Sequence, residues 1–315
     1  MTSADNAIGS ARITPARLDS SAVLWGALGV LVFSGSLPAT RRAVADLDPT
    51  VIGLGRALVA AALAAGLLAL RREPLPARPD LVRFAVTGAG VVIGFPIFST
   101  LALQDLSSAH ASVIIGLLPA ATAAFAVARA GERPGRAFWL SALAGLAAVL
   151  VFAATQGAAG LATADLYILA AVALGGLGYA EGGALSRRYG GWQTICWALL
   201  LTAPVIAPFV AVAVAREGLH ADAGAWAGFA YVALFSMFLG FFAWYRGLAL
   251  GGVARIGQIQ LAQPVLTLAW SALLLGEQVT LATVGAALLV LACVAATQRT
   301  RVGLTRPRTR AAASR

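Results

Sequence analysis

The sequence predicts an all-α integral membrane protein with ten transmembrane helices, arranged as a 5+5 inverted repeat with both termini in the cytoplasm. Three observations lead to this prediction. Ten stretches of the chain are predominantly apolar over about 20 residues, the length that crosses a bilayer as a helix. The arginines gather on alternate sides of these stretches. The second half of the chain repeats features of the first half at a constant spacing.

The composition excludes a soluble protein. Of the 315 residues, 60% are hydrophobic and 11% are charged, and the mean hydropathy is +0.84, whereas soluble domains carry about 25% charged residues. The net charge of +10 would suggest a nucleic-acid partner in a soluble chain. Here the charges lie at the ends of apolar stretches, so they indicate membrane topology and no nucleic-acid binding.

The scarce cysteines and histidines exclude several chemistries. Cys196 and Cys293 lie inside apolar stretches, which argues against a disulfide framework or a zinc site. His110 and His220 lie near segment ends, so no metalloprotease motif exists. We expect no metal and no cofactor. The first apolar stretch, from Ala22, lacks a distinct cleavage site, and we interpret it as a spanning helix rather than a signal peptide.

The ten predicted spans are separated by short polar or glycine- and proline-bearing breaks. They cover residues 22–40, 50–70, 82–103, 109–129, 137–155, 165–186, 193–215, 224–246, 254–275 and 280–297. The breaks at 104–108 and 247–253 are the least polar. Residues 1–20 form an N-terminal tail, and residues 299–315 form a basic C-terminal tail.

The basic residues, all of them arginine, predict the orientation. With the N-terminus inside, the inner loops and tails hold 19 arginines and the outer loops hold three, Arg41, Arg42 and Arg216. Arg56 lies within a span. Because positive residues resist translocation, both tails should lie in the cytoplasm of a bacterial cell, with the chain multi-pass in its inner membrane.

An offset of 145 residues relates the two halves. It superposes Pro119 on Pro264, Thr122 on Thr267, Gly131 on Gly276 and Glu132 on Glu277. The first repeat is predicted at 21–155 and the second at 163–298. Five spans in each unit force opposite orientations, which places Glu132 inside and Glu277 outside. Inverted repeats of this kind build a substrate site near the midplane that alternating access exposes to either side.

The chain resembles the EamA family of the drug/metabolite transporter superfamily over residues 21–298. The residues that carry the resemblance are Trp25-Gly26, Asp48-Pro49 leading to Arg56, the arms from Pro119 to Gly131-Glu132 and from Pro264 to Gly276-Glu277, and the later Gly145 and Gly285. The resemblance implies a ten-helix fold that carries small metabolites, amino acids or drug-like compounds. The seventh span departs from it, with Trp197 or Leu199 where an arginine equivalent to Arg56 would stand.

Polar stripes on two equivalent spans predict a shared pathway, because polar groups avoid lipid. In the ninth span, Gln260, Pro264, Thr267 and Ser271 share one helix face, with Gln263 on its flank. The equivalent face of the fourth span holds Ser108, Ser112, Ile115, Pro119 and Thr122. We expect Gln260, Gln263, Ser112 and Thr267 to line the pathway, and Pro119 and Pro264 to break their helices and serve gating. Helix-to-helix hydrogen bonding is the alternative.

Glu181 is the sharpest single candidate for a functional charge. It lies in a glycine-rich stretch that allows close helix approach or bending, about 9 Å from Arg187 along a helix. Burial would favour proton exchange near neutral pH or binding of a cationic amine. The alternative is that the carboxylate reaches the inner interface or pairs with Arg187 or Arg188.

Further candidates come from one arginine and several aromatic residues. Arg56 lies about 9 Å inside the outer boundary, where it could contact a substrate anion or extend back to the headgroups. Trp25, Tyr179, Trp244 and Tyr245 are either cavity walls or interface aromatics. On an ideal helix, Tyr179 points away from Glu181.

These features favour a secondary transporter that moves a small organic solute, with protons as coupling ion and export as direction. An uptake permease or an uncoupled facilitator is the alternative, and a channel or sensor is a weaker one. No Walker motif is present, and scattered carboxylates do not support an enzyme. The expected partners are a small-molecule substrate, the lipid bilayer and protons. The number of chains stays open, with a homodimer among the options.

Overall fold

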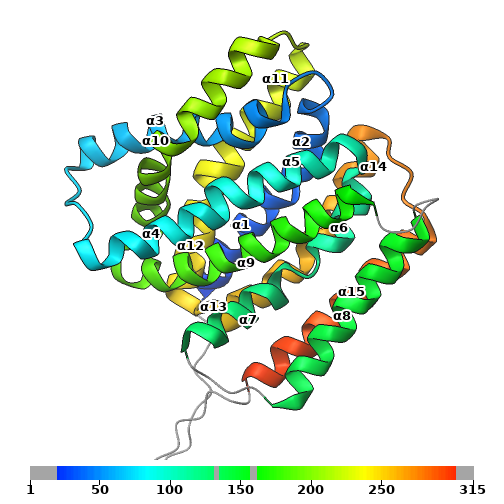
Figure 1. Cartoon of the computed structure of the whole chain (residues 1–315). Coiled ribbons are helices and arrows are strands. Elements are labelled where there is room, and N and C mark those ends of the chain that lie inside the picture. Colours follow the sequence, from blue (N-terminus) through cyan, green and yellow to red (C-terminus); the bar gives the residue numbers. More distant parts are fainter. Residues whose placement is uncertain (1–19, 131–134, 157–161, 303–315) are drawn as a thin grey trace, which may run out of the picture.

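The computed structural model describes residues 20–130, 135–156 and 162–302, and every regular element in these ranges is a helix (Figure 1). Eight helices are long and apolar enough to cross a membrane, and two shorter apolar helices, Ile259–Leu275 and Leu281–Ala296, follow them. The prediction of an all-helical membrane protein is confirmed. The eight long ones are Ser20–Ala43, Val51–Arg71, Arg78–Asp105, Ser108–Ala128, Arg136–Thr155, Thr163–Tyr189, Gly191–Glu217 and Ala223–Gly251.

Most of these segments are assembled from shorter pieces. The first half contains α1 (Ser20–Ser34), α2 (Ser36–Ala43), η1 (Val51–Gly55), α3 (Arg56–Arg71), η2 (Arg78–Asp80), α4 (Leu81–Gly88), η3 (Ala89–Gly94), α5 (Phe95–Asp105), α6 (Ser108–Ile115), α7 (Leu118–Ala130) and α8 (Arg136–Gln156). The second half contains α9 (Thr163–Tyr189), α10 (Gly191–Glu217), α11 (Ala223–Ala230), η4 (Tyr231–Leu239), α12 (Gly240–Gly251), α13 (Val253–Ile259), η5 (Gln260–Ala262), α14 (Gln263–Leu275) and α15 (Leu281–Val302).

Some helix interruptions in the first half recur in the second half at the repeat offset of 145 residues. The π-helical segments η3 and η4 overlap when the chain is shifted by 145 residues, since η3 then falls on residues 234–239. The fourth span breaks between α6 and α7, and the ninth breaks at the 3₁₀ turn η5 between α13 and α14. π-Segments and short 3₁₀ pieces inside a helix locally displace backbone hydrogen bonds and commonly occur at functional sites. Two interruptions therefore recur at corresponding places in both halves, whereas η1 and the break between α1 and α2 fall on the continuous helices α10 and α9.

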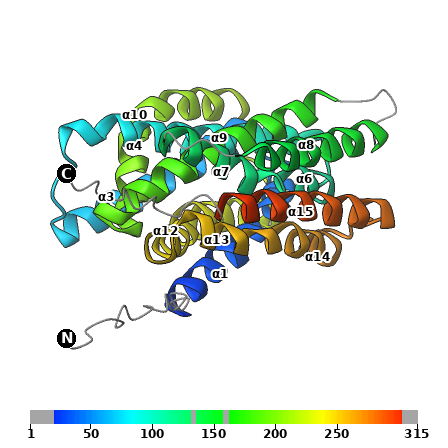
Figure 2. The same cartoon turned by 90° about the horizontal axis from the view of Figure 1, so that it is seen from below.

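The two halves pack helix against helix. α1 contacts α12, α2 contacts α11, α3 contacts α10 and α14 contacts α6. The long helix α9 runs through the middle of the bundle (Figure 1), where it contacts α4, α5, α7, α10 and α12. α8 and α15 pair with each other at one edge of the molecule (Figure 1), and they lie side by side when it is seen from below (Figure 2). The interface between the halves therefore forms the interior of the bundle.

Glycine allows the closest helix approaches. A Cβ atom on Gly90 of η3 would lie 2.6 Å from the carbonyl oxygen of Leu174 and 2.7 Å from the Cα of Gly178, both on α9. On the same helix, a Cβ on Gly176 would lie 2.9 Å from the amide nitrogen of Thr122 in α7. Small residues let membrane helices approach backbone to backbone. Because α9 is continuous from Thr163 to Tyr189, its glycines provide close packing rather than a bend.

Candidate substrate cavity

A small cavity lies inside the bundle where the two halves meet. The first half lines it with Phe33, Ser36, Leu37, Arg56, Val91, Phe95 and Pro96, and the second half with Tyr179, Ser236, Met237, Phe241 and Gln263. These residues come from nine different elements, so no single helix forms the site. The enclosed volume is about 30 Å³, room for about two water molecules.

Arg56 contributes the one cationic side chain among the described residues that line this cavity. It is the first residue of α3, directly after the π-helical η1, and it is 2% exposed. Its Nε donates a long hydrogen bond of 3.4 Å to the carbonyl oxygen of Gly53, and its buried Nη2 has no hydrogen-bond partner. The side chain therefore lies within the bundle.

Two glutamines mark the ninth-span side of the cavity. Gln260 and Gln263 are 2% and 4% exposed, and the Nε2 of Gln260 lies 3.5 Å from the Oε1 of Gln263. Gln263 lines the cavity, whereas the Oε1 of Gln260 is buried without a hydrogen-bond partner. Both predicted glutamines thus lie in the interior, and Gln263 reaches the site itself.

The hydroxyl groups of the predicted stripes form hydrogen bonds between helices or within one. Thr267 donates to the carbonyl oxygen of Ser34 at 2.8 Å, and Ser112 donates to the carbonyl oxygen of Ala109 at 2.8 Å. Neither is among the residues that line the cavity. Ser36 and Ser236 line the cavity instead, and their hydroxyl oxygens are 2.7 Å apart. The polar periodicity of the spans did not indicate these two residues.

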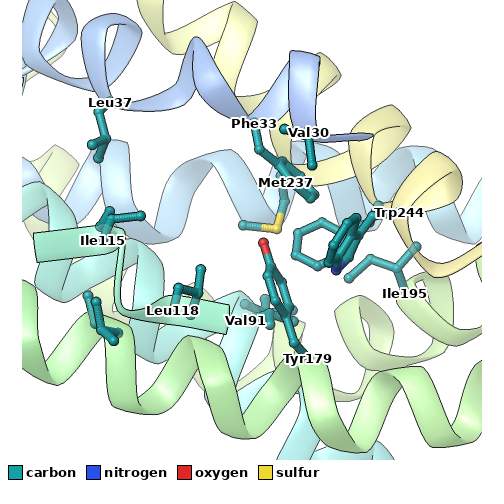
Figure 3. Packing of buried hydrophobic residues seen from close by; sticks show 14 of the residues in the cluster. Val30, Phe33, Leu37, Val91, Ile115, Leu118, Tyr179, Ile195, Met237 and Trp244 are labelled. Atoms are coloured by element: carbon teal, nitrogen blue, oxygen red, sulfur yellow. The ribbon is translucent and has the colours of Figure 1, made fainter. Parts of the chain in front are cut away.

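Aromatic rings form one wall of the cavity. Phe33 packs against Phe241 with ring centroids 5.0 Å apart, and Tyr179 lies 5.9 Å from Phe241 and 5.6 Å from Trp244. The Tyr179 ring rises from α9 toward Met237 and Phe33 (Figure 3). The indole Nε1 of Trp244 is buried without a hydrogen-bond partner.

Trp244 packs against Tyr179 but does not itself line the cavity, and the other two aromatic candidates lie elsewhere. Tyr245 is fully buried and donates to the carbonyl oxygen of Gly178 at 3.2 Å, so it joins α12 to α9 and does not line the cavity. Trp25 is 41% exposed on α1. It therefore lies on the outside of the described bundle, in a place suited to lipid contact.

Glu181 lies on α9, is not among the residues that line the cavity, and belongs to an ion-pair network. It is 1% exposed and pairs with the Nε of Arg83, an arginine on α4 that is 98 positions away in sequence. The Arg83 guanidinium also lies 3.9 Å from Asp80, which binds Arg188 and the Tyr189 hydroxyl at 2.6 Å each. The recorded ion pair of Glu181 is with Arg83 and not with the expected Arg187 or Arg188, because its partner comes from a different span and sequence spacing could not indicate it.

A second polar network closes the other end of the helices. Arg42 pairs with Asp222 and lies 3.8 Å from Asp46, while Arg41 donates to the carbonyl oxygen of Leu103 at 2.6 Å. The hydrogen bond from the Ala225 amide to Asp222, followed by the interaction with Arg42, lowers the pKa of this carboxyl group. This network joins the loop before α11 to the end of α2.

Glu277 caps a helix rather than lining the pathway. Its carboxylate accepts hydrogen bonds from the backbone amides of Ser108 and Ala109 at 2.9 and 2.8 Å, and from the Ser108 hydroxyl at 3.0 Å. A carboxylate at the first turn of α6 satisfies otherwise free amides and suits the helix dipole. Glu132, its partner in the repeat, lies outside the described residues.

The two prolines occupy equivalent places. Pro119 is the second residue of α7 and Pro264 is the second residue of α14, so each follows a break in its span. Proline suits this position because its missing amide hydrogen is not needed in the first helical turn.

In the described part of the chain, no group of three or more His, Cys, Asp or Glu side chains could hold a metal ion.

Comparison with known proteins agrees with this architecture. The model of the EamA-like transporter family matches the chain twice, over residues 20–154 and 162–297. A Bacillus subtilis (strain 168) protein called "Uncharacterized transporter YdeK" is 49% identical over 274 residues, which cover 87% of this chain and 96% of the relative. A protein crystal structure is similar in fold, with a TM-score of 0.62, 22% identity and coverage of 88% and 98% of the two chains. The two family matches and the near full-length relative establish that this chain belongs to the EamA-like transporter family.

Proposed function

We propose that the protein is a secondary transporter that carries a small organic solute through the central cavity by alternating access. The observation that supports this most directly is the cavity itself, because both halves of the chain line it with polar and aromatic side chains. A site between two repeats can be opened to either side when one half moves against the other. Amino acids, other metabolites and drug-like amphiphiles are the solutes in scope.

The proposed topology is a 5+5 inverted repeat in the bacterial inner membrane, with both termini in the cytoplasm. The matching helix interruptions of the two halves support the repeat, and the 19 arginines on one side against three on the other support the orientation. In this topology, the Glu181–Arg83 network lies toward the cytoplasm. The Arg42–Asp222 network lies toward the outside.

We propose proton-coupled export, with Glu181 as the coupling residue and its Arg83 pair as part of the inner gate. Protonation of a carboxylate removes its charge, so it would weaken the ion pair and favour opening of that side. Uptake and uncoupled facilitation use the same cavity and are the alternatives. A channel or a sensor would show neither saturation nor competition between solutes.

A reconstituted flux assay tests these proposals. Purified protein is placed in liposomes that contain a pH-sensitive dye, and amino acids, monocarboxylates and amines are added outside. We expect a saturable, solute-dependent proton flux in the wild type and none in Glu181→Gln. Glu217→Gln, a change at the exposed end of α10, is the matched control and should keep the flux.

The outcomes separate the parts of the proposal. Solute flux without proton movement would remove proton coupling and leave a facilitator. Full proton-linked flux in Glu181→Gln would remove Glu181 as the coupling residue. Flux that rises linearly with solute and shows no competition would favour a channel and overturn alternating access.

A further inference from the structure

Arg56 is a buried cation whose hydrogen-bonding capacity is almost unused. A guanidinium group has five N–H donors and remains charged in proteins. In the described part of the chain, its recorded bond is the long one to Gly53, no carboxylate forms an ion pair with it, and its Nη2 is buried without a partner. A buried charge in such surroundings is unfavourable unless an anion compensates it.

Among the described residues, the other buried charged side chains have polar partners within the chain. Glu181 pairs with Arg83, Asp80 pairs with Arg188, and Asp165 lies 2.8 Å from the Nε2 of His110. Arg56 differs from these groups because its side chain lines the central cavity. An anion that enters the cavity would therefore supply the counter-charge for Arg56 that the described residues do not provide.

The surroundings of Arg56 define which anion would fit. Gln263, Ser36 and Ser236 bring neutral polar groups to the same cavity, and no described residue that lines it is acidic. Phe33, Tyr179 and Phe241 line it with aromatic rings. A carboxylate can accept two parallel hydrogen bonds from a guanidinium group. An apolar body attached to it would pack against the rings, whereas an ammonium group would find no counter-charge.

We propose that Arg56 anchors the carboxylate of a monoanionic solute with an aromatic or branched apolar body. This inference rests on the proposed transport function and specifies the solute class of the same cavity. At the repeat offset of 145 residues, Arg56 falls on Leu201 of the seventh span, so the repeat supplies no second arginine there. The cavity therefore offers one cationic anchor, which matches one anionic group.

Thermal unfolding of the detergent-purified full chain tests the anchor. The probes are benzoate, 3-phenylpropionate and 4-methylpentanoate, each compared with its neutral amide and with the amine of similar size. We expect the carboxylates alone to raise the Tm of the wild type in a saturable manner, because a ligand that binds the native state stabilises it. Arg56→Gln should weaken this binding at least about tenfold, and Arg56→Lys should retain part of it, since lysine keeps the charge but loses the two-pronged geometry.

The unliganded Tm separates anchoring from a structural role. Arg56→Gln removes an uncompensated buried charge, so its Tm without probe should equal or exceed that of the wild type. Arg216→Gln, which alters an exposed arginine at the end of α10, is the matched control and should leave both Tm and probe binding unchanged. A lower Tm for Arg56→Gln without probe would indicate a structural role and overturn the proposal.

The wild type alone also decides the charge preference, even where a variant does not fold. An amide or amine that raises the Tm as much as its carboxylate, or no shift with any carboxylate, would overturn the anchor. Liposome flux with the same probes separates this result from transport. Arg56-dependent binding without flux would leave the anchor and remove transport. Full flux of neutral or cationic solutes in Arg56→Gln would leave transport and remove the anchor.

Discussion

The ion pair between Glu181 and Arg83 is strongly asymmetric, because the carboxylate is 1% exposed and the guanidinium is 35% exposed. Loss of the arginine would leave a buried charge without this counter-charge, whereas loss of the carboxylate would leave a cation that water can reach. We therefore expect Arg83→Gln to destabilise the protein by about 2 kcal/mol, less than the 3–5 kcal/mol typical of a fully buried pair. Glu181→Gln should cost clearly less.

Thermal unfolding in detergent measures this difference. The double variant Arg83→Gln/Glu181→Gln should recover most of the loss, because the buried position then carries a neutral amide. Arg216→Gln is a useful comparison, since that side chain is exposed at the end of α10 and should contribute little. Equal destabilisation by Arg83→Gln and Glu181→Gln, without recovery in the double variant, would refute the asymmetric pair.

At the residue scale, local sequence indicated candidates but not their partners. The polar stripe of the ninth span predicted that Gln260 and Gln263 face inward, because a polar group on an apolar helix avoids lipid. It could not separate Gln263 in the cavity from Thr267, which hydrogen-bonds to α1. That distinction depends on what the neighbouring helix presents. For Glu181, the partner comes from a different span, and helix periodicity contains no information about such pairs.

The contact between η3 and α9 depends on glycine at both surfaces. A methyl group on Gly90 would collide with the backbone of α9 at 2.6–2.7 Å, and backbone atoms cannot swing aside as a flexible side chain can. We expect Gly90→Ala to destabilise the protein by about 1–3 kcal/mol, the usual cost of overpacking. It should also reduce transport, because Val91, the next residue, lines the cavity.

A matched glycine controls for helix propensity. Gly66 lies in α3 and has no atom within 4 Å of an added Cβ, so Gly66→Ala should be neutral or stabilising by up to about 1 kcal/mol. Thermal unfolding and liposome flux of the two variants give the comparison. A Gly90→Ala protein as stable and active as Gly66→Ala would show that η3 and α9 do not pack backbone to backbone.

At the element scale, hydropathy located the spans but not their internal breaks. All ten predicted segments coincide with helical stretches, because the apolar length needed to cross a bilayer is a strong signal. The π-helical η3 and η4 left no such signal, since apolar residues that favour an α-helix also fill a π-turn. Pro119 and Pro264 indicated two breaks, and each proline lies just after its break, where the first turn tolerates it.

On the scale of the whole molecule, the interior is the boundary between the two halves. Helices from the first half contact helices from the second throughout the bundle, and the cavity lies on that boundary. The repeat spacing of 145 residues predicted two related units, but not the small size of the cavity, which results from how both halves pack. Under the proposed alternating access, the two ionic networks are where the bundle would open and close.

The arginine distribution predicts which network faces the cytoplasm. Leu75 lies in the loop before α4 and is 81% exposed, and Leu219 lies in the loop before α11 and is 44% exposed. Because positively charged loops stay inside, the loop between Arg72 and Arg78 should be cytoplasmic. We therefore expect a membrane-impermeant maleimide to label Leu219→Cys in intact cells, and Leu75→Cys only after the membrane is permeabilised.

The wild-type protein is the background control, since Cys196 and Cys293 both lie inside helices and should label weakly. Labelling of Leu75→Cys alone in intact cells would invert the topology and place the Glu181–Arg83 pair at the outer side. An inner proton-linked gate would then become an outer one. Labelling of both loops in intact cells would mean that the chain inserts in two orientations, and the 19-to-3 arginine bias would not be sufficient to orient it.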